Sequence, residues 1–117
     1  MKETNLLKRE LFYEFLLFIA GIASVCLFFK NNILLMVVLI AGWIIGILVW
    51  HEKHDIIFFL VGAILGSLGE LVCVNYGVWR YENPSFLGIP IWLPFVWGLS
   101  AVFIKRVSET FLKIEKK

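Results

Sequence analysis

Glu70 is the acidic residue best placed to do chemistry, because it lies deep within a long apolar run that extends from residue 56 to residue 79. If that run is a helix, which rises about 1.5 Å per residue, the carboxyl lies ~21 Å from its start. A charge at such a depth in a membrane costs at least ~2.5–3.5 kcal/mol, so Glu70 must be paired, hydrated or protonated. Ionisable residues inside spans are generally functional, so Glu70 is the candidate acid of a proton-handling or ligand-binding site. The alternative is a structural hydrogen bond to a neighbouring helix.

Aromatic side chains and two prolines follow Glu70 at spacings that could bring them to the same depth. Pro90 and Pro94 each remove a backbone donor and free a carbonyl four residues earlier, so the outer half of a helix over residues 86–104 should be kinked or broken. Indole N–H groups and freed carbonyls would then converge on the acid in the outer half of the membrane. The residues expected to line this ligand-binding site with Glu70 are Tyr76, Trp79, Arg80, Tyr81, Pro90, Trp92 and Trp97. The alternative is a proline kink with interfacial tryptophans.

Other chemistries have little support in the sequence. The polar stretch His51-Glu52-Lys53-His54-Asp55 places its two histidines three residues apart rather than the four of a zinc-protease helix, and it favours a solvated turn over a metal site. We find no Ser–His–Asp set, no phosphate-binding loop and no basic–aromatic surface for nucleic acid. The prediction is therefore no metal, no cofactor and no nucleic-acid partner. Glu14, near the start of the first apolar run, is interpreted as an interfacial charge, with a functional role as the alternative.

The elements that must position Glu70 follow from composition. The chain has 117 residues, 61% of them hydrophobic and 17% charged. A soluble domain is usually ~45–50% apolar and ~25% charged, so an ordinary soluble enzyme is excluded. Four apolar runs, at residues 11–29, 33–50, 56–79 and 86–104, each approach the ~20 residues that cross a bilayer as a helix. The predicted fold class is all-α: a polytopic membrane protein with one domain, a four-transmembrane-helix bundle and a kinked fourth helix.

Turn and packing residues support these boundaries. Asn32, Asp55 and Ser85 are placed to cap the second, third and fourth helices. Glycines recur every three or four residues in the third run, and the second run contains a G-x-x-x-G pair at Gly42 and Gly46. Because lipid provides no hydrophobic drive for helix association, such small residues mark close helix packing, either within one chain or in a dimer.

Basic residues predict the orientation. Nine of the eleven Lys and Arg residues lie before the first run, after the fourth, or between the second and third, and only Lys30 and Arg80 lie on the other side. By the positive-inside rule, both termini should be cytoplasmic, in a bacterial or archaeal cytoplasmic membrane. The basic, amphipathic stretch 105–117 should continue the fourth helix past the membrane or lie on its cytoplasmic surface.

Residues 66–98 carry a motif block, G-x-x-x-E-x(5)-Y-G-x-W-x-Y followed by G-I-P-I-W-L-P-x-x-W-G. This block, about a quarter of the chain, resembles carotenoid biosynthesis membrane proteins of the bisanhydrobacterioruberin hydratase type. The resemblance implies an acid-catalysed addition of water to an isoprenoid double bond, with aromatic rings around the carbocation. The positions that match are Glu70, Tyr76, Gly77, Trp79, Tyr81, Gly88, Pro90 and Trp97.

Three functional hypotheses remain open. The first is an intramembrane site around Glu70 for a lipid or isoprenoid-like ligand, hydratase-like or without catalysis. The second is a proton-coupled dimer that resembles the small multidrug transporters, with Glu14 as the acid in its first helix. The third is an accessory subunit of a larger membrane complex. The partners expected are therefore membrane lipids, an isoprenoid ligand, and a second copy or a larger complex.

Overall fold

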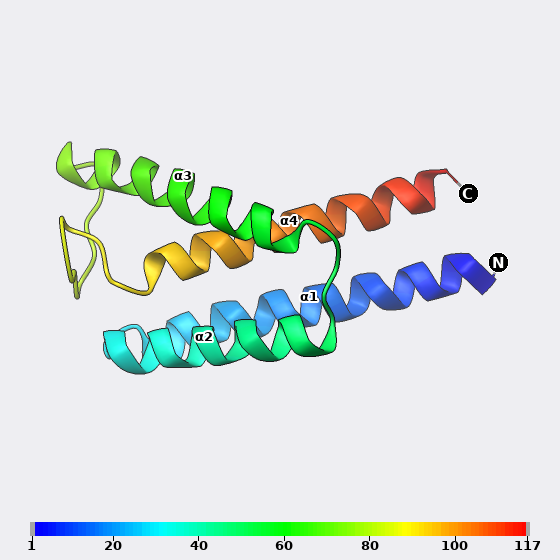
Figure 1. Cartoon of the computed structure of the whole chain (residues 1–117). Helices are drawn as coiled ribbons and strands as arrows, with labels where there is room; N and C mark the ends of the chain where they lie inside the picture. Colours follow the sequence, from blue (N-terminus) through cyan, green and yellow to red (C-terminus); the bar gives the residue numbers. More distant parts are fainter. Residues whose placement is uncertain (1, 117) are drawn as a thin grey trace.

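The computed structural model describes residues 2–116 and contains four helices in that range (Figure 1). They are α1 (Lys2–Phe28), α2 (Asn32–Val49), α3 (Asp55–Asn75) and α4 (Leu93–Glu115). They lie roughly along one axis in a molecule of 50 × 26 × 21 Å. Both described ends of the chain lie at one end of the bundle, and the α1–α2 turn and the α3–α4 loop lie at the other. The all-α prediction is confirmed for the described residues.

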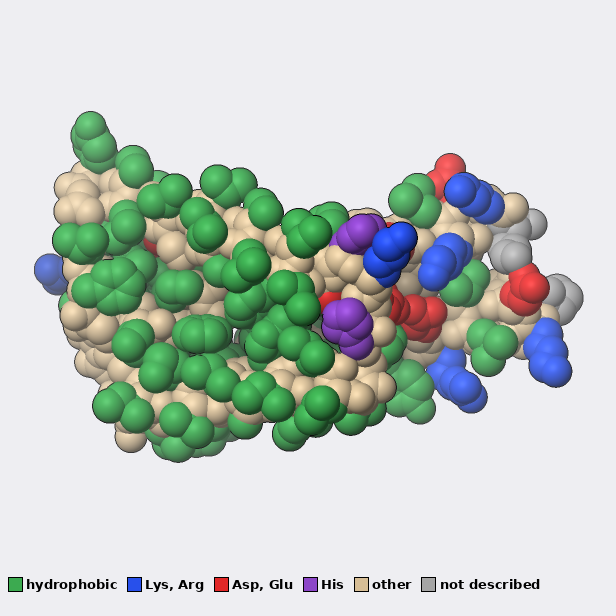
Figure 2. Space-filling view, viewed as in Figure 1, with side chains coloured by type: hydrophobic (Ala, Val, Ile, Leu, Met, Phe, Trp, Pro, Cys, Tyr) green, Lys and Arg blue, Asp and Glu red, His purple; other side chains and the backbone are tan. Residues whose placement is uncertain are grey.

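Most of the apolar side chains on α1, α2 and α3 face outward rather than into a core. Figure 2 shows this hydrophobic surface covering most of the molecule, while the charged side chains gather towards the end that holds the termini. Exposed apolar surface of this extent is costly in water and ordinary in lipid. Three helices, α1, α2 and α3, are long and apolar enough to cross a membrane, so the chain is membrane-associated.

The fourth helix differs from the predicted run 86–104, because it begins at Leu93 rather than at residue 86. Pro94 occupies its first turn, where a missing N–H removes no helical hydrogen bond, and Pro90 precedes the helix. The predicted kink is therefore wrong, since the prolines start this helix instead of bending it, whereas the alternative of a broken outer half agrees with the non-helical residues 86–92. Its charges begin at Lys105, so its apolar part, residues 93–104, is about 18 Å long. α4 then continues through the basic stretch to Glu115.

The α3–α4 loop, residues 76–92, is the other departure from expectation, because the predicted helix 56–79 ends at Asn75. Gly77 takes a positive φ of 78°, which ends the helix. Further on, Leu87 and Gly88 both have positive φ, and Phe86 and Ile89 exchange backbone hydrogen bonds across this tight turn. These bonds satisfy backbone groups that would otherwise be costly in an apolar setting.

Asparagines attach this loop to the α1–α2 turn. Asn83 Nδ2 donates to the carbonyls of Phe29 and Lys30, and Asn32 Nδ2 donates to the Asn83 carbonyl and to Ser85 Oγ.

The predicted helix caps are wrong. Asn31, not Asn32, caps α2 with its side chain, and His54 and Trp92 take the cap positions of α3 and α4 without a side-chain bond.

Glycines of α3 let α4 pack against it. A Cβ atom added at Gly62 or Gly66 would collide with Ala101 or with Trp97 of α4, and one added at Gly98 would collide with the Phe59 ring. α4 also contacts α1 and α2, whereas α2 and α3 diverge. α4 is therefore the helix around which the others are arranged.

Candidate functional site

The Glu70 site comprises Glu70 on α3, Trp79 and Tyr81 on the α3–α4 loop, and Trp97 on α4. Trp79 Nε1 and the Tyr81 hydroxyl donate to Glu70 Oε2 at 2.8 and 2.9 Å, and Trp97 Nε1 donates to Oε1 at 3.2 Å. Glu70 itself is 8% exposed. Within residues 2–116 no cation pairs with it, so three neutral donors compensate the carboxyl group.

Each donor is held in place by the local fold. Trp97 lies against Gly66, one helical turn before Glu70, and only a glycine leaves room for the indole there. Tyr81 and Trp79 reach Glu70 because α3 ends at Asn75 and the loop turns back over it. Burial and the bond to Glu70 both raise the pKa of Tyr81 above its ordinary value, so this hydroxyl remains a donor.

The edge of the site reaches the molecular surface. Trp79 is 44% exposed and Trp97 is 37% exposed. Both indole N–H groups point to Glu70 while part of each ring lies on the face that would contact lipid. A molecule in the bilayer could therefore approach the carboxyl by displacing one indole, and Trp97 makes the longest of the three bonds.

The other residues expected at this site lie elsewhere. Trp92 is buried, but its Nε1 donates to Asn32 Oδ1 at 3.0 Å, and its ring meets the edge of Tyr81. Pro90, two residues before this tryptophan, is also buried. Tyr76 is 84% exposed and Arg80 is exposed, and neither bonds to Glu70. Trp92 thus supports the site through Tyr81, and the sequence overestimated how many side chains meet the acid.

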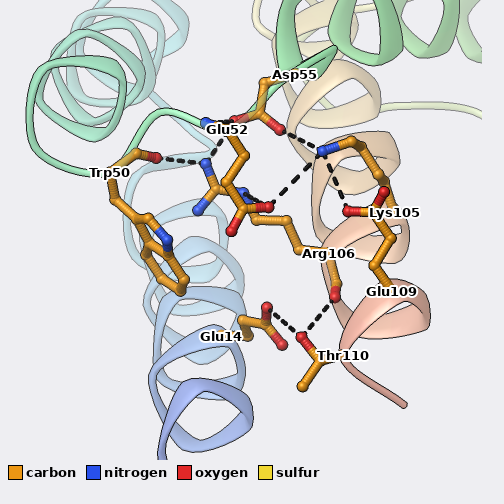
Figure 3. Close-up of polar contacts among 8 residues, drawn as sticks. All are labelled: Glu14, Trp50, Glu52, Asp55, Lys105, Arg106, Glu109 and Thr110. Atoms are coloured by element: carbon orange, nitrogen blue, oxygen red, sulfur yellow. Dashed lines mark hydrogen bonds and ion pairs between the residues drawn. The ribbon is translucent and has the colours of Figure 1, made fainter. Parts of the chain in front are cut away.

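A second polar group, the ion cluster, lies near the opposite end of the α3–α4 pair (Figure 3). Lys105 Nζ lies 3.0 Å from Asp55 Oδ1, 3.4 Å from Glu109 and 3.8 Å from Glu52. Asp55 is only 1% exposed. Burial lowers the pKa of Lys105, but the hydrogen bond and attraction of Asp55 and Glu109 outweigh burial and raise this pKa above its ordinary value.

Arg106 completes the ion cluster and ties it to α2. Its Nη2 donates to Asp55 Oδ2 and to the Trp50 carbonyl, and its guanidinium lies 4.4 Å from the centre of the Trp50 ring. The cluster therefore joins the end of α2, the start of α3 and the middle of α4. Sequence analysis interpreted residues 51–55 as a solvated turn and missed it. The sequence did contain a signal for the ion cluster: the acidic residues in 51–55 and the basic residues Lys105 and Arg106 flank two apolar runs on the same predicted side of the membrane.

Glu14 of α1 lies beside the ion cluster and is 2% exposed. It is thus buried between helices rather than an exposed interfacial charge. Its only hydrogen-bond partner is the Thr110 hydroxyl of α4, 3.1 Å from Oε2, and its Oε1 atom has no partner within the described chain. Over residues 2–116 we find no group of His, Cys, Asp and Glu side chains arranged to hold a metal ion.

Comparison of the chain with models of protein families, with curated proteins and with solved structures found no match.

Proposed function

We propose that this chain is a small integral membrane protein whose Glu70 site binds the polar end of a lipid or isoprenoid-like molecule from the bilayer. The observation that carries the proposal is a buried carboxyl held only by neutral donors, two of which are indoles on the outward-facing surface. A binding site in lipid needs a polar anchor that water does not already satisfy, with apolar surface around it. Glu70 and its tryptophans meet both needs.

The geometry favours a ligand that donates a hydrogen bond. All three protein donors point at the carboxyl, so Glu70 acts as an acceptor in this arrangement. A ligand hydroxyl could take the place of Trp97 Nε1 on Oε1 and leave Trp79 and Tyr81 bonded to Oε2. An isoprenoid alcohol or a hydroxylated lipid therefore fits the site better than a pure hydrocarbon.

The resemblance to the hydratases extends this proposal to catalysis. In such a step Glu70 would transfer a proton to one alkene carbon, and a water oxygen would bond to the resulting carbocation. The protonated alcohol would then return a proton to the carboxylate. Tyr81, whose oxygen can accept as well as donate, is the group that could hold Glu70 in its protonated form. Incorporation of isotopically labelled water into an isoprenoid alkene would test this step.

Binding is tested by native mass spectrometry of the protein released from lipid nanodiscs loaded with geranylgeraniol, or with the matching hydrocarbon that lacks the hydroxyl. We expect the wild-type protein to retain the alcohol in preference to the hydrocarbon. In Glu70→Gln the preference should fall by up to about tenfold, because the carboxyl that accepts the ligand hydroxyl is lost and one hydrogen bond is worth about 0.5–1.5 kcal/mol. Glu82→Gln, which changes an exposed carboxyl of the α3–α4 loop, is the matched control. Equal binding by wild type and Glu70→Gln would reject the proposal.

Assembly with other subunits is a second candidate function, favoured by one observation on α2. Gly42 and Gly46 face open space, since a Cβ atom at either position would meet nothing within 4 Å. Such a pair is typical of a helix that packs closely on another helix in the membrane. The same mass spectra would show the oligomeric state, and Gly42→Leu should abolish an assembly that Glu70→Gln leaves intact.

The proposal also includes four membrane crossings, with α4 and the adjoining apolar loop forming the fourth and both termini in the cytoplasm. The concentration of basic residues at the end that holds the termini supports this orientation.

A further inference from the structure

Thr110 makes two contacts that its single hydroxyl proton cannot serve together. Its Oγ1 lies 2.9 Å from the Arg106 carbonyl and 3.1 Å from Glu14 Oε2, and both of these oxygens accept hydrogen bonds (Figure 3). A hydroxyl group donates once and accepts through its lone pairs. The hydroxyl proton can therefore serve only one of the two contacts. In the other contact, the proton must come from the group that Thr110 faces.

The helix settles which contact Thr110 donates to. A threonine inside a helix commonly donates to the carbonyl four residues earlier, and the Arg106 carbonyl is that group and the nearer of the two. The Thr110 oxygen then presents lone pairs to Glu14. A carboxylate at 3.1 Å would meet this oxygen with no proton between them, whereas a carboxylic acid would donate its own.

The surroundings of Glu14 favour the same state. Its Oε1 atom is buried and has no partner among the described residues, a costly arrangement for a carboxylate and a cheaper one for the carbonyl oxygen of an acid. The charged groups around it are two carboxylates, Glu10 on α1 and Glu52 on the α2–α3 loop, and one cation, Arg106 on α4. α2, which packs on α1, carries no titratable side chain.

We propose that Glu14 is a proton-binding site: it is a neutral acid that donates to Thr110, and when it releases its proton to water, Arg106 becomes its counter-ion. The Nε atom of Arg106 is buried and makes no hydrogen bond in the described chain, and it lies 3.9 Å from Glu52 Oε1. An unpartnered donor and an unpartnered acceptor thus lie in the same cluster. Proton release would draw together α1 and the part of α4 that already holds Asp55.

The test is infrared spectroscopy of the purified protein in lipid nanodiscs over a range of pH. The wild-type protein should show the C=O stretching band of a buried carboxylic acid, and the band should disappear as the pH rises. Glu14→Gln should lack it, and Glu115→Gln, which alters an exposed carboxyl at the end of α4, should keep it. Glutamine can donate to Thr110 as the acid does, so this variant is expected to fold. A Glu14→Gln spectrum that matches wild type at every pH overturns the proposal.

Two further variants test the partners. Thr110→Val removes the acceptor of the Glu14 proton, so the band should shift to higher frequency. An unchanged frequency would contradict a hydrogen bond from Glu14 to Thr110. This variant also tests the proposal if Glu14→Gln fails to fold. Arg106→Gln removes the counter-ion, so the band should persist to a higher pH than in wild type, whereas Arg106→Lys, which keeps the charge, should move it less. Loss of the band at the same pH in Arg106→Gln and wild type would overturn the role of Arg106.

Discussion

A carboxyl group surrounded by apolar residues needs cations or hydrogen-bond donors beside it. In this chain the carboxyl groups of Asp55 and Glu70 have partners of different kinds. Asp55 has two cations, Lys105 and Arg106. Among residues 2–116, Glu70 has only neutral N–H and O–H donors. A pair of full charges holds its partners strongly, while neutral donors can be exchanged one at a time for a ligand group. This difference supports the proposal that the Glu70 site, rather than the ion cluster, binds a ligand.

Removing one indole donor should weaken the Glu70 site measurably. Trp79→Phe and Trp97→Phe each keep an aromatic ring but lose the N–H, so each should lower the free energy of unfolding by about 1.5–3 kcal/mol. Reversible unfolding in detergent micelles measures this loss. Trp43→Phe is the control, because Trp43 stacks on Phe59 and is not a donor to Glu70. Equal losses in all three variants would show that ring packing, not the N–H, matters.

Lys105 gives a dependence on alkaline pH. Its pKa is raised in the folded chain, so the stability it contributes is complete below its unfolded value of about 10.5 and is lost as the pH rises through the folded value. Lys105→Gln should therefore cost about 3 kcal/mol at neutral pH, and the gap to wild type should close at high pH. Thermal unfolding across that range measures the gap, with Lys113→Gln on the exposed face of α4 as control. A gap that stays constant with pH would contradict this role.

At the scale of elements, the α3–α4 interface is the main packing surface, and its closeness depends on Gly66. Gly66→Ala would push a methyl group into the Trp97 ring, which should cost about 1–3 kcal/mol and disturb the Glu70 site. Gly69→Ala is the matched control on the same helix, because a Cβ atom there meets open space. That change should be neutral or stabilising by up to about 1 kcal/mol. Unfolding in detergent distinguishes the two, and similar effects would show that the interface is looser than described.

Hydropathy located the helices well and their ends poorly. The predicted range 33–50 agrees with α2 to within a residue, but residues 76–79 and 86–92 are as apolar as a helix while forming a loop. Apolar composition reports depth in a membrane, not backbone geometry. The loop exists because Asn83, Asn32 and the turn at Leu87 satisfy its polar groups, and those bonds join segments about fifty residues apart.

The candidate site shows the same limit. Glu70 could be identified from its own position, because the depth of an acidic residue in an apolar run can be seen without knowing its contacts. Its three donors, Trp79, Tyr81 and Trp97, were among the residues expected with it. Trp92 was also expected there but donates to Asn32, and this contact depends on how α2 packs against the loop. The ion cluster was missed and Glu14 was interpreted as an interfacial charge, because the partners of these residues depend on which side chains α4 brings beside α1 and α3.

At the scale of the whole molecule, four crossings would leave both described ends on one side of the membrane. Reporter fusions at either end should both report the cytoplasm, and a cysteine at Leu87, an exposed position of the α3–α4 loop, should react with an impermeant maleimide added from outside. Lys53→Cys, in the α2–α3 loop, should be protected in intact cells and serve as control. Termini on opposite sides would mean that α4 does not cross.

The central position of α4 has a consequence for biosynthesis. α4 contacts each of the other three helices, yet it follows them in the chain and is translated after them. During insertion α1 and α2 can pair early, but α3 must wait in the bilayer with Glu70 lacking Trp97 and Asp55 lacking both of its cations. A chain halted before Leu93 would leave Asp55 without either cation and Glu70 with two of its three donors. The helix that completes the bundle is thus also the one that reveals whether synthesis has finished.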